Sequence, residues 1–342
     1  MPSASARRAG DTVDLFRPGP YVRRSTESPH RADCLEMSRS APIGPIAIVG
    51  AGALGTALAR GLSANGHQVE AVVSRNEEDA RALANRVGAS VAGTTGTALP
   101  APVRLVLICV PDDAIEDVAE DLGHCGHPWG DTVVAHTSGA KRAAVLDPLA
   151  RQGAAPMSFH PVQTFTEETP PEAFEGIAVG LEGDDRALAV GEALAGVLGA
   201  QPLRLTPDEK ARYHCAAALA SNGLVALLAV VEEVLGGLKE EDTAASGAAL
   251  VAPLVEHTWA NLKEGRPEEV LTGPVMRGDT GTVQAHLDAL EREAPHLVPV
   301  YAALSREMVR VAARGGHLSD DQAEALRSSL GTGTDADPDS ER

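Results

Sequence analysis

Short apolar runs alternate with helical patterns through the first half of the chain. Runs typical of β-strands lie at 46–49, 68–73, 105–110, 132–135, 155–159, 177–181 and 202–205, with a weaker one at 89–91. Helical patterns lie between several of them, at 54–64, 77–86, 113–122, 141–149 and 186–198. Continuous apolar strands separated by helices are typical of a parallel sheet covered on both faces. The first half is therefore predicted to be an α/β domain with a mostly parallel sheet.

The strand pattern stops after Thr206, and the remaining residues are predicted to form helices. These are expected at 207–235, 240–263, 280–291, 298–314 and 319–328. Proline suits the first turn of a helix, so we place the domain boundary between Thr206 and Pro207. Four segments are expected: a disordered arm (1–42), the sheet domain (43–206), an all-α domain (207–330) and a disordered acidic tail (331–342).

The overall charge limits the kinds of partner that the protein can bind. Among 342 residues, 48 are acidic and 29 are basic, giving a formal net charge of −19. This charge repels nucleic-acid phosphates and anionic lipid surfaces, so neither nucleic acid nor a membrane is expected as a partner. Hydrophobic residues make up 44% and charged residues 23%, which is typical of a soluble globular protein.

The cysteines and the most apolar segment favour a soluble, intracellular protein. Four scattered cysteines and the lack of a signal-peptide pattern indicate the cytoplasm. The apolar run 215–231 contains Ser221, Asn222 and Gly223, which favours a buried helix over a membrane span. The segment HCGH at 124–127 has no second cluster to complete a zinc site, so no metal is expected.

A glycine-rich turn carries the strongest functional signal. Gly50, Gly52 and Gly55 in GAGALG follow an apolar strand and open a helix. In such a turn the first glycine bends the chain, the second lets the backbone approach a pyrophosphate, and the third lets the helix pack on the strand. Backbone N–H groups at the helix start, including those of Ala53 and Leu54, attract the anion. The turn predicts a dinucleotide site; the alternative is an ordinary strand-to-helix turn.

The end of the second strand indicates which dinucleotide is preferred. Domains that prefer NAD usually carry Asp or Glu there to bind the ribose hydroxyl. This chain has Ser74 and Arg75, which can donate hydrogen bonds to a 2′-phosphate, whereas a carboxylate would repel it. NADP is therefore the predicted cofactor; the alternative is a solvated pair with no ligand.

The third strand runs into Val110, Pro111 and Asp112. Ligands of open α/β sheets lie beyond the carboxyl ends of the strands, so these three residues are expected to line the cofactor cleft. Asp113 is expected to cap the following helix, and the alternative is that it lines the same cleft.

Further polar residues are candidates for the substrate side of the cleft. Ser138 in HTSG and His160 in FHPVQT follow the next two strands, while Lys210, His214 and Asn222 share a stripe on the first helix of the all-α domain. A cleft that holds a substrate would satisfy this polar stripe. The alternatives are a helix cap at Ser138, a structural histidine at His160, and an internal network or subunit contact for the stripe.

These motifs together resemble a known family. The segments are IAIVGAGALGTALA, LICVPDDAI, HTSG, SFHPVQTF, KARYHCAAALASN and LTGPVMRGD. They resemble Rossmann-like oxidoreductases with an uncharacterised helical C-terminal domain, in the superfamily that includes 6-phosphogluconate dehydrogenase, pyrroline-5-carboxylate reductase and ketopantoate reductase. The resemblance covers about residues 45 to 328. It implies a Rossmann-type fold, an NADP-linked reductase and a homodimer built through the helical domain.

One departure from the family affects the substrate. Ketopantoate and hydroxy-acid members place a catalytic Lys and an Asn one turn apart, whereas here His214 follows Lys210 by four residues and Asn222 lies three turns on. We expect hydride transfer to the carbonyl of a small acid, with ketopantoate as one example. Lys210 or His214 would be the general acid, Asn222 and Ser138 orienting donors, and His160 a second candidate acid. The alternatives are a cyclic-imine reductase and a non-catalytic NADP(H)-binding sensor.

Overall fold

The computed structural model describes residues 43–94, 99–100, 103–236 and 247–331. The predicted arm at 1–42 and nearly all of the predicted tail lie outside these residues. The chain divides into two compact units, residues 1–214 and 215–342, and each is described by itself. The expected boundary was between Thr206 and Pro207. The two units divide instead between His214 and Cys215, within the helix Glu209–Ala218.

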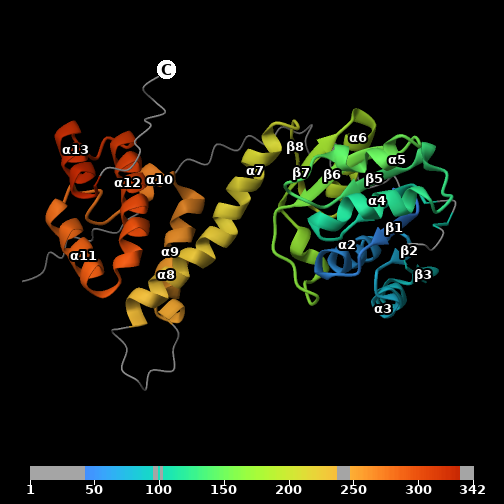
Figure 1. Ribbon diagram of the computed structural model, residues 1–342, viewed down its shortest axis with the longest axis horizontal. Helices are drawn as coiled ribbons and strands as arrows, with labels where there is room; N and C mark the ends of the chain where they lie inside the picture. Colours follow the sequence, from blue (N-terminus) through green and yellow to red (C-terminus); the bar gives the residue numbers. More distant parts are fainter. Residues whose placement is uncertain (1–42, 95–98, 101–102, 237–246, 332–342) are drawn as a thin grey trace, which may run out of the picture. The chain divides into compact units, whose positions relative to one another are not determined.

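The first unit is built on one eight-stranded sheet (Figure 1). Its strands are β1 (Ile46–Val49), β2 (Val69–Val73), β3 (Val91–Gly93), β4 (Leu105–Ile108), β5 (Val133–His136), β6 (Ala155–Pro161), β7 (Ala178–Gly183) and β8 (Gln201–Arg204). Their order is β3-β2-β1-β4-β5-β6-β7-β8, and every pair is parallel except β6 with β7. The predicted fold class, a Rossmann-type and mostly parallel sheet, is confirmed.

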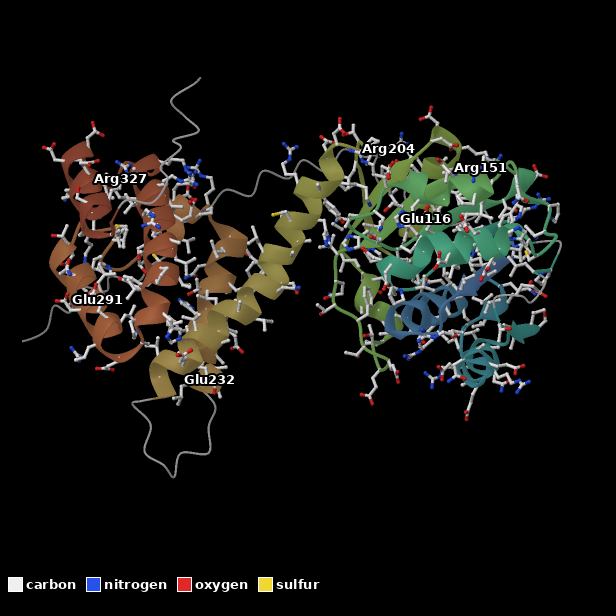
Figure 2. The ribbon with its side chains drawn as sticks, viewed as in Figure 1. Glu116, Arg151, Arg204, Glu232, Glu291 and Arg327 are labelled. Atoms are coloured by element: carbon white, nitrogen blue, oxygen red, sulfur yellow. The ribbon has the colours of Figure 1, made fainter. Side chains whose placement is uncertain are left out.

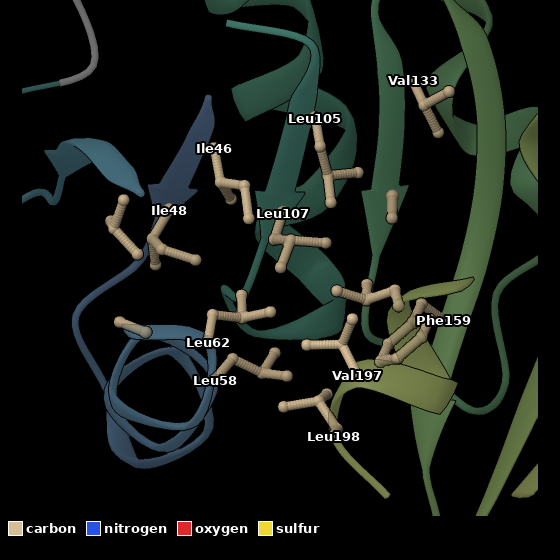
Figure 3. Close-up of a cluster of buried hydrophobic side chains, with 14 of the residues drawn as sticks. Ile46, Ile48, Leu58, Leu62, Leu105, Leu107, Val133, Phe159, Val197 and Leu198 are labelled. Atoms are coloured by element: carbon tan, nitrogen blue, oxygen red, sulfur yellow. The ribbon is translucent and has the colours of Figure 1, made fainter. Parts of the chain in front are cut away.

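Helices cover both faces of this sheet. The α-helices of the unit are α2 (Ala53–Ala64), α3 (Glu77–Val87), α4 (Ile115–Gly123), α5 (Asp147–Ala150) and α6 (Asp185–Val197). Alternate residues of β1 point to opposite cores. Ile46 and Ile48 pack with α2 and α6 (Figure 3) and with α3, while Ala47 and Val49 pack with α4 and α5. Because both faces are buried, the strands are apolar throughout, and this made them visible in the sequence.

Two helix starts differ from the prediction. The helix expected at 141–149 is a 3₁₀ turn, Ala143–Leu146, followed by the short α5. Pro148 lies in the first turn of α5, where a missing N–H costs nothing, so it favours a fresh helix start at Asp147. The prediction that Asp113 caps α4 is wrong: the 3₁₀ turn Asp112–Ala114 precedes α4, whose cap is Ala114.

The second unit is helical. Its elements are the π-helical turn η5 (Leu219–Gly223), α8 (Leu224–Gly236), α9 (Gly247–Glu264), α10 (Pro267–Val270), α11 (Thr280–Glu293), α12 (Val298–Arg314) and α13 (Asp320–Ser329). Val283, Leu287, Val309 and Leu326 form its core. The helix α7 (Glu209–Ala218) begins in the first unit and leads into η5.

Both units carry charged side chains on their surfaces. Charged side chains such as Glu116 and Arg151 on the sheet unit and Glu291 on the helical unit are exposed (Figure 2). Among the described residues, one helical stretch, Glu209–Gly236, meets the length and composition of a membrane span. The expectation of a buried helix at 215–231 is wrong, because none of the most apolar window of this stretch is buried. A single stretch of this kind is weak evidence, and it contains the Asn222–Gly223 pair that a lipid-facing helix disfavours.

Candidate active site

The glycine turn has the geometry that its sequence requires. Gly50 adopts φ +108, and a Cβ there would lie 2.4 Å from the carbonyl oxygen of Cys109. At Gly55 a Cβ would lie 1.9 Å from the carbonyl oxygen of Gly50. These are impossible contacts, so only glycine fits either position in this backbone.

Gly52 differs from its two neighbours because space is open beside it. No atom lies within 4 Å of the position where its Cβ would be. Gly52 is also the N-cap of α2, and it offers no side chain to the free N–H groups of the first turn. The partly positive end of α2 is therefore left for an external anion.

A cavity of about 800 Å³ opens beside this turn and joins three strand ends. Its wall includes Gly50 and Gly52 after β1, Ser74 and Arg75 after β2, and Val110 and Pro111 after β4. Parallel register explains the convergence, because Val49 pairs with both Val73 and Ile108. Of the residues expected to bind the cofactor, Ala53, Leu54, Gly55 and Asp112 are not in this wall.

Asp112 was expected to line the cofactor cleft, and its side chain contacts Ser138 instead of the cavity wall. Its carboxylate accepts a hydrogen bond from Ser138 Oγ at 2.7 Å, and its neighbour Asp113 lines the cavity instead. The 3₁₀ turn that starts at Asp112 points consecutive side chains in different directions, and a strand pattern does not show this.

One face of α3 also belongs to the cavity, and the sequence analysis missed it. Asp79, Ala82, Leu83 and Arg86 line the wall at spacings of three and four residues, which is one helical face. This periodicity was the available signal. Within the described residues neither Arg75 nor Arg86 forms an ion pair, so both guanidinium groups are free to meet an anion.

The wall fits a dinucleotide with an added phosphate. It offers a helix N-terminus without a capping side chain, open space at Gly52, and two unpaired guanidinium groups, Arg75 after β2 and Arg86 on α3. Gly50, Gly52, Ser74 and Arg75 would hold the phosphates. Burial raises the pKa of the Cys109 thiol to about 12, so this wall residue stays protonated and uncharged.

Lys210 is the centre of a second group of polar residues in the same unit. It lies in the first turn of α7 and is only 1% exposed. Its Nζ donates to the carbonyl oxygen of Ser138 at 3.1 Å and to Ser158 Oγ at 2.5 Å. Burial lowers the pKa of Lys210 to about 8, and the nearby carboxylates of Glu182 and Asp112 oppose this shift. Lys210 therefore holds a proton that it can exchange near neutral pH.

Two buried histidines beside Lys210 are neutral. His136 Nδ1 accepts from the backbone N–H of Ser138 at 3.2 Å, so Nε2 carries the proton and donates to the carbonyl of Arg142 at 3.2 Å. Burial and then the charge of Lys210 lower the pKa of both His136 and His160 to about 4. At neutral pH His160 has no imidazolium proton to donate, which leaves Lys210 as the better acid.

His160 is held by Tyr213, one turn along α7 from Lys210. Its Nδ1 lies 3.0 Å from the Tyr213 hydroxyl, which also donates to the His160 carbonyl at 3.2 Å. Burial raises the pKa of Tyr213 to about 12, so the phenol keeps its proton. A Cβ at Gly180 would lie 2.6 Å from the Tyr213 ring, so β7 needs glycine here.

His214 lies against His160, with ring centroids 5.8 Å apart. Its Nδ1 is buried and has no hydrogen-bond partner within the described residues. A Cβ at Gly139 would lie 2.4 Å from this atom, so the backbone after Ser138 approaches closely because residue 139 is glycine. An unpaired buried ring nitrogen is a candidate for contact with a bound molecule.

The two remaining predicted orienting residues have different positions. The Ser138 hydroxyl gives its proton to Asp112 and accepts the N–H groups of Ala140 and Lys141, so it caps the turn that follows β5. Asn222 is exposed in η5 of the second unit. Their roles toward a substrate stay predictions.

The sequence analysis considered a metal site in the segment 124–127 and expected none. Within it, His127 is buried, and its Nε2 lies 2.9 Å from Thr132 Oγ1. In the part of the chain that the structure describes, no three His, Cys, Asp or Glu side chains gather as metal ligands.

Comparison with known proteins supports the two-part organisation. A model described as a Rossmann-like domain matches residues 29–161, and a model described as a domain of unknown function (DUF2520) matches residues 177–308. The resemblance predicted from the sequence is thus confirmed in its two-domain form. No curated protein matches the chain.

Solved structures resemble the chain over most of its length. A Thermotoga maritima protein is 28% identical, with a TM-score of 0.65 over 79% of this chain and 98% of its own. A Bacteroides fragilis protein provisionally assigned as an NADP oxidoreductase is 26% identical, with a TM-score of 0.62 over 78% of this chain and 97% of its own. An imine reductase from Myxococcus stipitatus, solved with NADP⁺, shares the fold at 19% identity, with a TM-score of 0.55 over 83% of this chain and 99% of its own.

Proposed function

We propose that this chain, which joins a Rossmann-like domain to a DUF2520 domain, is an NADP-dependent oxidoreductase that reduces the carbonyl group of a small acid. One observation carries the proposal: the glycine-turn cavity and the Lys210 cluster lie at the same edge of one sheet. Pro111 lines the cavity, Asp112 follows it and accepts from Ser138, and the Ser138 carbonyl accepts from Lys210. The likeness to the Bacteroides fragilis protein supports the NADP assignment.

Reduction of a carbonyl group needs a hydride donor and a proton donor. Bound NADPH would supply the hydride that reaches the carbonyl carbon. Negative charge then grows on the carbonyl oxygen, and Lys210 donates a proton to this oxygen. Lys210 is suited to this step because its pKa of about 8 keeps the ammonium protonated at neutral pH but allows it to release the proton. We assign His214 Nδ1, which has no partner within the described residues, as a contact for the substrate. His160, held by Tyr213, lies against the His214 ring.

A substrate panel tests this proposal. NADPH oxidation should be measured with 2-keto acids, starting with ketopantoate, and with cyclic imines as the competing class. Turnover of a keto acid supports carbonyl reduction, while turnover of imines alone moves the assignment to C=N bonds. Tight NADPH binding without turnover of any compound would indicate a sensor rather than an enzyme.

The cofactor preference depends on Arg75. Replacing Arg75 by alanine removes a charged donor from the end of β2, so the affinity for NADPH should fall about 10- to 100-fold while that for NADH changes little. Calorimetric titration of both cofactors measures this ratio. Arg81→Ala is the matched control, because Arg81 is an exposed residue of α3 that pairs with Glu77 and does not line the cavity. An unchanged ratio in Arg75→Ala would refute the 2′-phosphate site.

We also propose that the helical unit forms a homodimer. Large apolar side chains on α8 and α9 are exposed, with Val225, Leu254 and Trp259 at 69%, 67% and 62%. Such a face favours association with another apolar surface. Light scattering should give a dimer for the parent and a monomer for Leu254→Glu, while Leu203→Glu on β8, also an exposed leucine, should stay dimeric. A monomeric parent would end this proposal.

A further inference from the structure

Ser158 is a buried polar residue of β6 that contacts Lys210. It is 0% exposed on β6, and strand register places it between His136 of β5 and Glu182 of β7. Its Oγ receives a hydrogen bond from Lys210 Nζ at 2.5 Å and donates one to the Ser138 carbonyl at 3.1 Å. An ammonium group only donates, so this direction of the two bonds is fixed.

Two acceptors therefore hold the Lys210 ammonium. Two of its three N–H groups go to Ser158 Oγ and to the Ser138 carbonyl. Within the described residues the third N–H has no acceptor. With two bonds fixed, the direction of the third is fixed as well.

We propose that Ser158 is a positioning residue, which holds the Lys210 ammonium so that its third N–H is directed at the substrate oxygen. The proposal rests on the function given above, in which Lys210 is the proton donor. Ser158 itself does not touch the reacting atoms. It acts through Lys210. Removal of the Ser158 hydroxyl should change both the pKa of Lys210 and the rate of substrate turnover.

The direction of that change follows from the charges around Lys210. The groups that face it are His136 from β5, His160 from β6, Glu182 from β7 and Asp112 after β4. The two histidines are neutral at neutral pH, while the carboxylates favour the ammonium. The Ser158 hydroxyl favours the ammonium too, because it accepts from the charged form. Loss of the hydroxyl should lower the pKa of Lys210 by about one unit.

The chain is well suited to a direct measurement, because it contains only four lysines: Lys141, Lys210, Lys239 and Lys263. NMR of protein labelled with ¹³C at lysine Cε resolves few signals, and a Lys210→Met variant assigns the one of interest. The Lys210 signal should titrate near pH 8 in the parent and about one pH unit lower in Ser158→Ala. Ser158→Thr keeps the hydroxyl and should restore the parental midpoint.

The control is Ser305→Ala, which removes an equally buried hydroxyl from the core of the second unit and should leave the Lys210 midpoint unchanged. If Ser158→Ala does not fold, Ser158→Cys keeps the volume with a weaker acceptor, and the midpoint should still fall. A folded Ser158→Ala or Ser158→Cys protein with the parental midpoint would overturn the proposal.

The NMR result is independent of turnover, so the two proposals can fail separately. If Lys210 is the proton donor, the basic limb of the pH profile of NADPH oxidation should move with the NMR midpoint. If the Lys210 midpoint shifts but the basic limb of the pH profile does not, Ser158 is a partner of Lys210, but Lys210 is not the proton donor. If Ser158→Ala leaves the Lys210 midpoint unchanged in an active enzyme, only the role of Ser158 is refuted.

Discussion

Replacing Lys210 by methionine is expected to lower NADPH-dependent turnover by about 100- to 10,000-fold, the usual contribution of a positioned general acid. Methionine keeps the unbranched apolar stem but has no N–H to donate. NADPH binding should be retained, because Lys210 is not among the residues that line the cofactor cavity. The loss should appear in kcat, measured by NADPH oxidation with the substrate found in the panel.

The same lysine sets the expected pH dependence. Activity needs the protonated amine, so turnover of the parent should decline as the pH rises through about 8. Lys141→Met is the control, because Lys141 is exposed and only its backbone N–H bonds Ser138. A Lys210→Met protein with the parental rate, or a parental profile that stays flat through pH 8 to 9, would contradict the assignment of the acid.

The fold was predictable because each buried strand or helix carries its pattern of apolar residues along its whole length. β1 and α12 have the predicted bounds, Ile46–Val49 and Val298–Arg314, since each carries an uninterrupted pattern that spans the element. The helix expected at 141–149 was wrong at its start. There, Ser138 Oγ accepts the backbone N–H of Lys141, and such a local side-chain bond competes with helix formation without changing the apolar spacing.

The site was predictable only where the chain itself determines the geometry. The glycine turn needs six consecutive residues, so its spacing was visible. The contacts of Lys210 depend instead on the register of strands far apart in the chain: His136 pairs with Ser158, which pairs with Glu182. A single serine within a mostly apolar strand gives no periodic signal, so Ser158 was missed. The sequence also could not show which of two adjacent aspartates lines the cavity, because the 3₁₀ turn after β4 sets the directions of Asp112 and Asp113.

Two substitutions in the glycine turn should separate an effect on folding from an effect on cofactor binding. Gly55→Ala should destabilise the fold by about 3 kcal/mol, because its methyl group would lie 1.9 Å from the Gly50 carbonyl oxygen and the backbone would have to move. Gly52→Ala should fold normally, since Gly52 has φ −75, which any residue adopts, and open space beside it. Its added methyl group would instead stand where a pyrophosphate must approach the backbone.

Gly52→Ala is therefore expected to weaken NADPH binding by on the order of 100-fold, the loss of one or two charge-assisted hydrogen bonds, with little change in the unfolding midpoint. Gly55→Ala should lower that midpoint strongly. Thermal unfolding and calorimetric NADPH titration measure the two effects separately. Gly130→Ala is the control, because Gly130 also has open space beside it but does not line the cavity, so neither quantity should change. Unaltered NADPH affinity in a folded Gly52→Ala protein would mean that no pyrophosphate approaches this turn, and the assignment of the whole cavity would then fail.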